Sequence, residues 1–158
     1  MAQLQQLEEF FSFNRPALYC VDFNRSFSPF MLSIKEVIAQ RANPMAITYR
    51  MNAQFIPSGH WIGSEEQGGR IIGEACHIFE LFCFLTDAKP VSIGVNTLNA
   101  QDPYNATENF SVHLRMSDGS LCTLIYSSMG SSACGKEYME LLFDGKTIIM
   151  DDFIHMYG

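Results

Sequence analysis

Residues 90–150 are dominated by short runs in which apolar and polar residues alternate. Strict alternation is the pattern of a β-strand with one buried face. Two Asp-Gly pairs, Asp118-Gly119 and Asp144-Gly145, stand between such runs, and this dipeptide favours the tight turn of a β-hairpin. We therefore expect an antiparallel meander, with strands over residues 90–98, 109–116, 121–127, 139–143 and 147–150.

Upstream of this meander lie one further strand pattern and one long helix. Residues 46–55 alternate like a strand, and residues 68–85, GGRIIGEACHIFELFCFL, are apolar on most sides of a helix. This order predicts an α+β fold class: a mostly antiparallel open sheet with helices packed on one face. The other face of the sheet would lie open unless a partner covers it.

Residues 1–42 are organised differently. Leu4, Leu7, Phe10 and Phe11 have helical spacing, and residues 30–41 predict a second, amphipathic helix. Between these helices, residues 17–23 form a nearly continuous apolar run, which is typical of a parallel strand covered on both faces. Two helices cannot bury such a strand alone, so this segment resembles a piece of a larger parallel sheet.

Composition and charge exclude several classes of function. The net charge is −7, and the 10 Lys and Arg residues are spread along the chain, which argues against nucleic-acid and anionic-membrane partners. No apolar run approaches the roughly 20 residues that a membrane span needs. The five cysteines form no C-x-x-C pair, and no secretory signal precedes them, so we expect a reducing, cytoplasmic location.

The long helix carries a narrow polar stripe of Arg70, Glu74, His77 and Glu80. A buried carboxylate requires a partner, and Glu74 lies three residues before His77 on the same side of the helix. Such a pair serves either as a general acid–base or as a hydrogen-bonded structural pair. The pattern alone leaves both readings open.

Other chemistry is less well supported by the sequence. His77 and Glu80 have a spacing suited to a metal, with His60 as a third ligand, but no further ligands are specified and we predict no metal site. No G-x-G-x-x-G occurs, so this chain has no dinucleotide fingerprint. The loop pair His60-Trp61 suits sugar stacking and loop anchoring equally.

Several of these stretches, in order, resemble one family. VDFNRSFSPF (residues 21–30), residues 47–86, KE (136–137) and DDF (151–153) are similar to the Gfo/Idh/MocA oxidoreductases, named after glucose–fructose oxidoreductase, inositol dehydrogenase and rhizopine catabolism. The most specific part is the run from Gly68 to His77. The resemblance implies an N-terminal Rossmann domain that binds NAD or NADP, and a C-terminal substrate domain that oligomerises through its open sheet face.

The resemblance also divides the chain. Residues 1–42 would be the C-terminal remnant of the dinucleotide-binding domain, ending in its last helix–strand piece. Residues 43–158 would be the substrate and oligomerisation domain, truncated at its end. The cofactor would be bound by the missing N-terminal domain, with no cofactor-binding residue in this chain.

Site residues follow from the same resemblance. His77 matches the histidine of the family's Asp-x-x-x-His motif, which assists proton transfer from a sugar hydroxyl. Gly73 stands where the aspartate would be, and the adjacent Glu74 is expected to orient His77 instead. Arg25 matches an arginine at the domain junction. The residues that resemble the substrate side of relatives acting in surface-polysaccharide pathways are Tyr49, Arg50, Asn52, His60 and Trp61.

The resulting hypothesis is the substrate-binding C-terminal part of an NAD(P)-dependent oxidoreductase, acting on a sugar or nucleotide-sugar hydroxyl and inactive as an isolated fragment. We expect a homo-oligomer formed through the open sheet face. The alternative is a non-catalytic sugar-binding or dimerisation module of the same fold.

Overall fold

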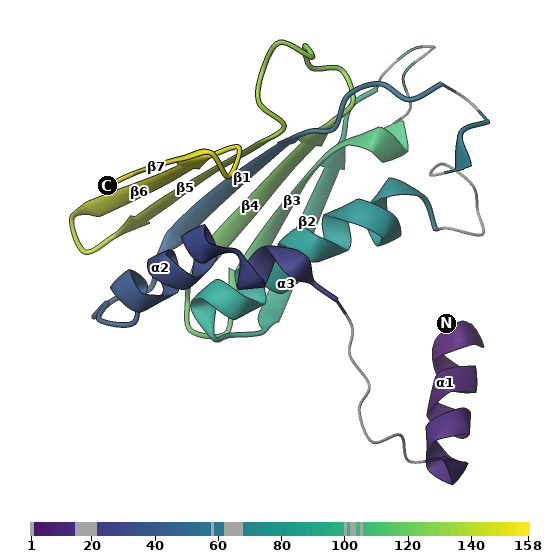
Figure 1. The fold of residues 1–158 in the computed structure, drawn as a ribbon, viewed down its shortest axis with the longest axis horizontal. Coiled ribbons are helices and arrows are strands. Elements are labelled where there is room, and N and C mark those ends of the chain that lie inside the picture. Colours follow the sequence, from purple (N-terminus) through teal and green to yellow (C-terminus); the bar gives the residue numbers. More distant parts are fainter. Residues whose placement is uncertain are drawn as a thin grey trace.

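The fold is built on one seven-stranded sheet with the order β2-β3-β4-β1-β5-β6-β7 (Figure 1). The computed structural model describes residues 2–14, 22–57, 59–61, 68–99, 101, 104 and 106–158. Among the described strands, β1 and β4 pair in parallel and the other pairs are antiparallel, which confirms the predicted α+β class. The strands are β1 (Ala46–Asn52), β2 (Pro90–Thr97), β3 (Asn109–Met116), β4 (Leu121–Ser127), β5 (Glu137–Phe143), β6 (Lys146–Asp151) and β7 (His155–Tyr157).

Both predicted Asp-Gly turns close hairpins, β3–β4 and β5–β6. Asp144 and Gly145 have φ values of 45° and 73°, as a two-residue turn of the right twist requires. Gly119 has φ 93°, a conformation that side chains rarely adopt.

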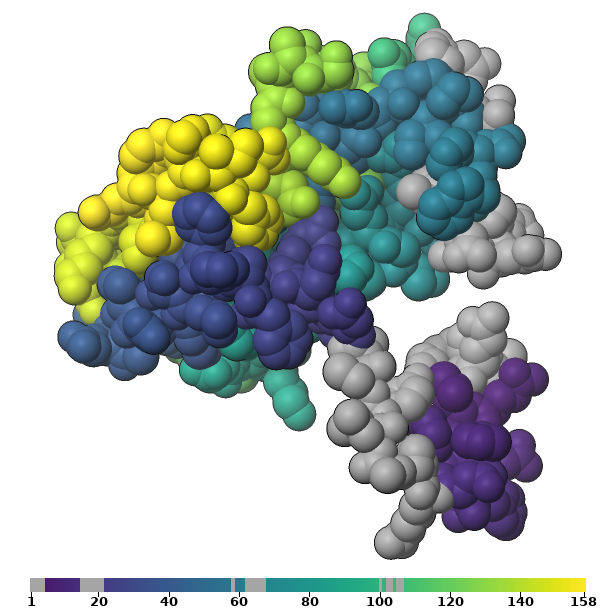
Figure 2. All heavy atoms as spheres, in the orientation of Figure 1, coloured from purple at the N-terminus to yellow at the C-terminus, as the bar shows by residue number. Residues whose placement is uncertain are grey.

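Helices α2 (Pro29–Ile38) and α3 (Cys76–Thr86) cover one face of the sheet (Figure 1). The N-terminus of α2 is fixed by Ser28, whose Oγ accepts a hydrogen bond from the Met31 amide at 3.3 Å, and by Pro29 in the first turn. Figure 2 shows α2 (blue) packed against the C-terminal strands (yellow). Among the described residues, the other helical segments are α1 (Ala2–Phe13), the 3₁₀ turns η1 (Asn24–Phe27) and η5 (Ala106–Glu108), and the π-helical turn η4 (Ile71–Ala75).

A single core lies between these helices and the sheet. In β1, alternate residues point into it, so Ile47, Tyr49 and Met51 are buried while Thr48 is exposed. The helices contribute a matching set of side chains that are fully buried: Met31, Ile34, Ile38, Ile78, Leu81, Phe82 and Leu85.

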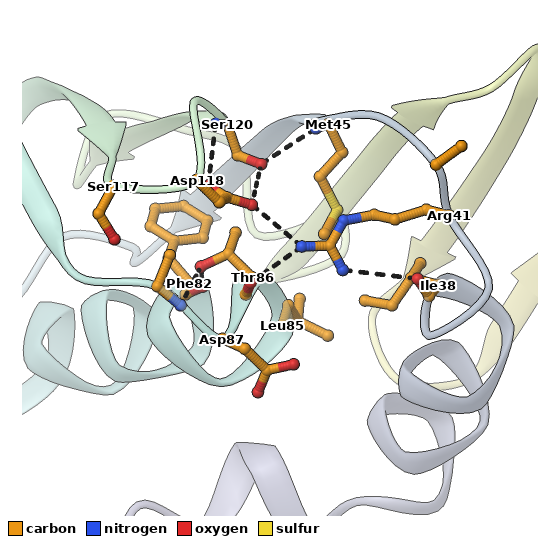
Figure 3. A network of polar contacts seen from close by, with 12 residues as sticks. Ile38, Arg41, Met45, Phe82, Leu85, Thr86, Asp87, Ser117, Asp118 and Ser120 are labelled. Atoms are coloured by element: carbon orange, nitrogen blue, oxygen red, sulfur yellow. Dashed lines mark hydrogen bonds and ion pairs between the residues drawn. The ribbon is translucent and has the colours of Figure 1, made fainter.

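The C-terminal end of α3 is fastened by two cations. Arg41 donates to the Thr86 carbonyl at 2.9 Å and pairs with Asp118 at 3.0 Å (Figure 3). Lys35 of α2 donates to the Phe84 carbonyl and pairs with Asp87 at 2.6 Å. Positive groups satisfy the unpaired carbonyls at a helix C-terminus and interact favourably with its dipole. These contacts fix the axis of α3 over the sheet, and therefore the position of His77 near its other end.

The N-terminal segment is described only in part. The helix predicted from Leu4 to Phe11 is present as α1, and the one predicted at 30–41 is α2. The apolar run at 17–23 falls mainly on residues 15–21, outside the described residues, so the strand predicted there stays a prediction. In the described part of the chain, no helix has both the length and the apolar character needed to cross a membrane.

Candidate functional site

The polar stripe of the long helix begins at η4, which runs directly into α3. A π-helical turn widens the helix by one residue and is frequent at functional sites. Arg70, just before this turn, is 4% exposed and donates to the carbonyls of Ala53 at 2.8 Å and Gln54 at 2.9 Å. Its Nε lies 3.5 Å from Glu108. Arg70 therefore anchors the helix to the end of β1 and to the segment before β3.

Glu74 is held by two partners from distant elements. Its carboxylate accepts a hydrogen bond from the Tyr126 hydroxyl and pairs with Lys136 Nζ at 2.5 Å. Burial acts to raise the pKa of Glu74, but the hydrogen bonds from Lys136 and Tyr126 outweigh it and the pKa is lowered. Glu74 is thus ionised and engaged with Lys136 and Tyr126.

His77 stands in a different setting from its neighbour. Its ring packs edge-on against Phe23, with the ring centroids 5.5 Å apart. The His77 Nδ1 atom is buried and has no hydrogen-bond partner among the described residues. Burial lowers the pKa of His77, and the positive charge of Arg25 lowers it further. At neutral pH the imidazole is therefore uncharged and able to accept a proton.

A buried ion pair lies beside the histidine. Arg25 of η1 binds Glu137 of β5 in a fork, with both nitrogen–oxygen distances 2.8 Å, and the Tyr49 hydroxyl donates to the same carboxylate. The Arg25 and Glu137 side chains are only 14% and 11% exposed. Burial and the nearby Glu137 charge raise the pKa of Tyr49 well above its usual value. This network ties the segment before α2 to the start of β5.

The structure brings some of the predicted site residues together and separates others. His77, Glu74 and Arg25 lie on the helix-covered side of the sheet. Arg50 lies on the opposite face, where its guanidinium sits 5.6 Å above the ring of Tyr138. Because neighbouring residues of a strand point to opposite faces, Tyr49 and Arg50 cannot line the same site.

Tyr49 and Asn52 have internal roles. Tyr49 is 0% exposed and bonded to Glu137, so it supports the network rather than presenting a surface. Asn52 is 4% exposed, and its amide donates to the carbonyls of Ser131 at 2.8 Å and Cys134 at 3.4 Å. It therefore holds the loop that carries Lys136 against the end of β1.

The predicted loop contacts stay untested. His60 and Trp61 have their rings 5.7 Å apart, and Trp61 is 64% exposed. Residues 62–67, which join this loop to the helix, lie outside the described residues, so a role of the loop over His77 remains a prediction. Among the described residues, no cluster of His, Cys, Asp or Glu is placed to hold a metal ion.

Sequence reasoning missed four residues of the site: Phe23, Tyr126, Lys136 and Glu137. The Lys-Glu pair at 136–137 was part of the family resemblance, and that is the one signal that could have drawn attention to it. Tyr126 lies in a strand pattern and carries no local sign of its contact with Glu74.

Fold and site together define an α+β domain with a histidine-bearing helix on a mostly antiparallel sheet. Residues 32–148 match the model of the GFO/IDH/MocA C-terminal domain, and the chain therefore belongs to this oxidoreductase family. No curated protein matches the chain in sequence.

Solved structures of the family share the fold at low sequence identity. UDP-N-acetylglucosamine 3-dehydrogenase GnnA from Acidithiobacillus ferrooxidans superposes with a TM-score of 0.73 at 16% identity, over 97% of this chain and 48% of that one. Myo-inositol dehydrogenase from Lactobacillus casei, in complex with NAD(H) and myo-inositol, superposes with a TM-score of 0.69 at 12% identity, over 98% of this chain and 44% of that one. The WlbA dehydrogenase from Bordetella pertussis, in complex with NADH and UDP-GlcNAcA, superposes with a TM-score of 0.64 at 17% identity, over 80% of this chain and 40% of that one. The chain thus spans less than half the length of each of these proteins.

Proposed function

We propose that the chain is the substrate side of an NAD(P)-dependent oxidoreductase that acts on a hydroxyl of a sugar or nucleotide sugar. The observation that carries the proposal is the buried Nδ1 atom of His77, which lacks a hydrogen-bond partner among the described residues. Burial and the charge of Arg25 also lower the pKa of this imidazole. An unsatisfied buried polar atom is rare in native proteins and is frequently functional. The dehydrogenases with the same fold, crystallised with UDP-GlcNAcA or myo-inositol, support the class of substrate.

In this proposal His77 moves the hydroxyl proton. Oxidation of an alcohol removes a hydride from carbon and a proton from oxygen, and a neutral imidazole is suited to take that proton near pH 7. The nicotinamide ring of NAD or NADP supplies the hydride acceptor when it is bound. Lys136 and Glu74 together offer a donor and an acceptor to neighbouring hydroxyls, since the Lys136 side chain is 46% exposed.

The same proposal assigns residues 1–42 to the end of a dinucleotide-binding domain and residues 43–158 to the substrate domain. Phe10 and Phe13 of α1 are 56% and 84% exposed, which is expected of a helix that packs in a larger domain. This chain has no dinucleotide fingerprint, so NAD or NADP would be held by a separate domain.

We also propose a homo-oligomer through the sheet face opposite the helices. That face mixes polar groups such as Arg50 with exposed apolar residues: Leu121 is 57%, Ile125 45% and Leu142 46% exposed. A partner copy would remove these side chains from water.

A non-catalytic sugar-binding or dimerisation module is the second candidate. It is favoured by Gly73, which stands where the family has its aspartate, and by Glu74, whose described partners are Lys136 and Tyr126. Turnover of a His77 variant distinguishes the two candidates.

If the cofactor is bound by a separate domain, the binding of NADH to this chain can be predicted. We expect no binding of NADH to the 158-residue chain by isothermal titration calorimetry or fluorescence, because the glycine-rich turn that holds the pyrophosphate is lacking. The complete oxidoreductase, titrated in parallel, should bind NADH. Tight binding to the chain alone would contradict the proposed division.

A further inference from the structure

Strand β2 is an edge of the sheet with an unusual surface. Its sequence, PVSIGVNT, contains no charged residue, and Val91, Ile93 and Val95 are 62%, 66% and 56% exposed. Ile93 lies opposite Leu114 and Val95 opposite Val112, both of which are buried. Ile93 and Val95 therefore point to the helix-covered side of the sheet but lie beyond the cover of α3. Val91, at the register shift, lines a groove on this side together with Phe79 of α3.

At the apolar positions of β2, the backbone amide and carbonyl groups point away from β3, toward the open edge of the sheet. The Leu98 amide donates to the Asn109 carbonyl at 2.9 Å. In an antiparallel pair, alternate residues bond to the neighbouring strand, so Asn96 and Gly94 also face β3. The amide and carbonyl groups of Ile93, Val95 and Thr97 then point away from β3, along the edge.

The two edges of the sheet are protected to different degrees. Natural edge strands are commonly kept short or are guarded by charges, prolines and bulges. The opposite edge, β7, has only 3 residues. In β2, Pro90 and a register shift between Pro90 and Ser92 guard the start of the strand only. The stretch from Ser92 to Thr97 is left as a regular, uncharged edge.

We propose that β2 pairs antiparallel with β2 of a second copy of this chain, about a two-fold axis at Ile93. The segment Val-Ser-Ile-Gly-Val shows the same apolar pattern in both directions, so one register matches it to itself. Ile93 then faces Ile93 of the partner subunit, and Val95 faces Val91 of the partner subunit. A symmetric dimer needs such a self-complementary surface.

Charge and shape both favour a second copy as the occupant of this edge. Each chain carries a net charge of −7, so two copies repel, but the absence of charge on β2 removes local repulsion. A groove of about 340 Å³ runs between α3 and β2, lined by Phe79, Pro90, Val91, Ser92, Ile93 and Leu114. Pairing would place the two grooves on the same face of one continuous sheet, one on each side of the two-fold axis. This surface is separate from the open face and does not depend on the enzymatic proposal.

Single-cysteine variants test the register. The first variant is Ile93→Cys, in a background with Cys20 and Cys134 replaced by serine. The Cα atoms of position 93 in the two subunits would lie about 5.5 Å apart across the axis, which is within disulfide range. The matched control is Val95→Cys, on the same face of the same strand, whose two copies would be about 14 Å apart. Mild oxidation should convert most of Ile93→Cys to a covalent dimer and leave Val95→Cys monomeric on a non-reducing gel. Equal cross-linking of both variants, or of neither, would overturn the register.

Sedimentation measures the interface itself. Two lysines at the axis repel each other, so Ile93→Lys should halve the mass of the wild-type assembly and raise its dissociation constant at least about tenfold. Ile125→Lys, on the open face, should leave the β2 pairing in place. A monomeric wild-type chain would overturn the proposal, as would an assembly that survives Ile93→Lys but is dissociated by Ile125→Lys.

Discussion

Replacement of His77 by alanine in the complete oxidoreductase is expected to lower kcat by about 10²- to 10⁴-fold, the range for loss of a general acid–base. The KM for the sugar should change far less, because proton transfer stabilises the transition state and not the bound substrate. The His77 pKa is lowered by burial and by Arg25, so the wild-type rate should rise with pH through a pKa below the ordinary histidine value. Formation of NADH, followed by absorbance across a pH series, measures both effects.

Glu80→Gln is the matched control for this prediction. Glu80 lies three residues further along α3 and accepts a hydrogen bond from Ser26, so its change perturbs the same helix without touching the imidazole. We expect kcat of Glu80→Gln to stay close to the wild-type value, and its rate to rise with pH as the wild-type rate does. Unchanged turnover in His77→Ala would contradict a catalytic role and favour the non-catalytic module.

Replacement of Glu137 by alanine is expected to lower the free energy of unfolding by about 3–5 kcal/mol, the cost of breaking a buried ion pair. The change removes the acceptor of the Arg25 fork and of the Tyr49 hydroxyl at once. It leaves the Arg25 guanidinium, on a side chain that is only 14% exposed, without its carboxylate. Urea unfolding of the chain measures the loss of unfolding free energy, when the dependence of that free energy on urea concentration is held equal between variants.

Asp87→Asn provides the comparison for an exposed pair. Asp87 binds Lys35 at 2.6 Å, but its side chain is 74% exposed, so we expect a loss below about 1 kcal/mol. Asparagine also tolerates the left-handed backbone of this position, where φ is 55°. In the double variant Arg25→Met/Glu137→Ala, part of the Glu137 loss should be recovered. Equal losses for Glu137→Ala and Asp87→Asn would show that the buried network does not stabilise the fold.

Much of the sheet could be predicted because its determinants are local. Alternation places every second side chain in the core, and the Asp-Gly pairs specify the turns of β3–β4 and β5–β6. The place of β1 between β4 and β5 has no such local signal, since β1 pairs with strands about 75 to 95 residues away along the chain. The short strand β7 was also not predicted, because three residues carry too little pattern.

Of the site, only the residues that share one face of the long helix could be predicted. Helical periodicity brought Glu74 and His77 together, yet the contacts that set their chemistry come from afar: Glu74 binds Tyr126, 52 residues away. Arg25 and Glu137 are separated by 112 residues, and nothing local links them. The period of two could have separated Tyr49 from Arg50 beforehand, because adjacent strand residues face opposite ways.

A titration of the chain with hydroxyl-rich ligands, followed by NMR at the histidine side chains, tests the proposed sugar site most directly. UDP-N-acetylglucosamine, myo-inositol and free hexoses serve as probes. We expect at least one of them to shift the His77 imidazole signals saturably. His113, on the opposite face of the sheet and bonded to Thr123 at 3.2 Å, should not move. Shifts at His113 without shifts at His77, or no response of His77 to any of these ligands, would contradict a sugar site at this helix.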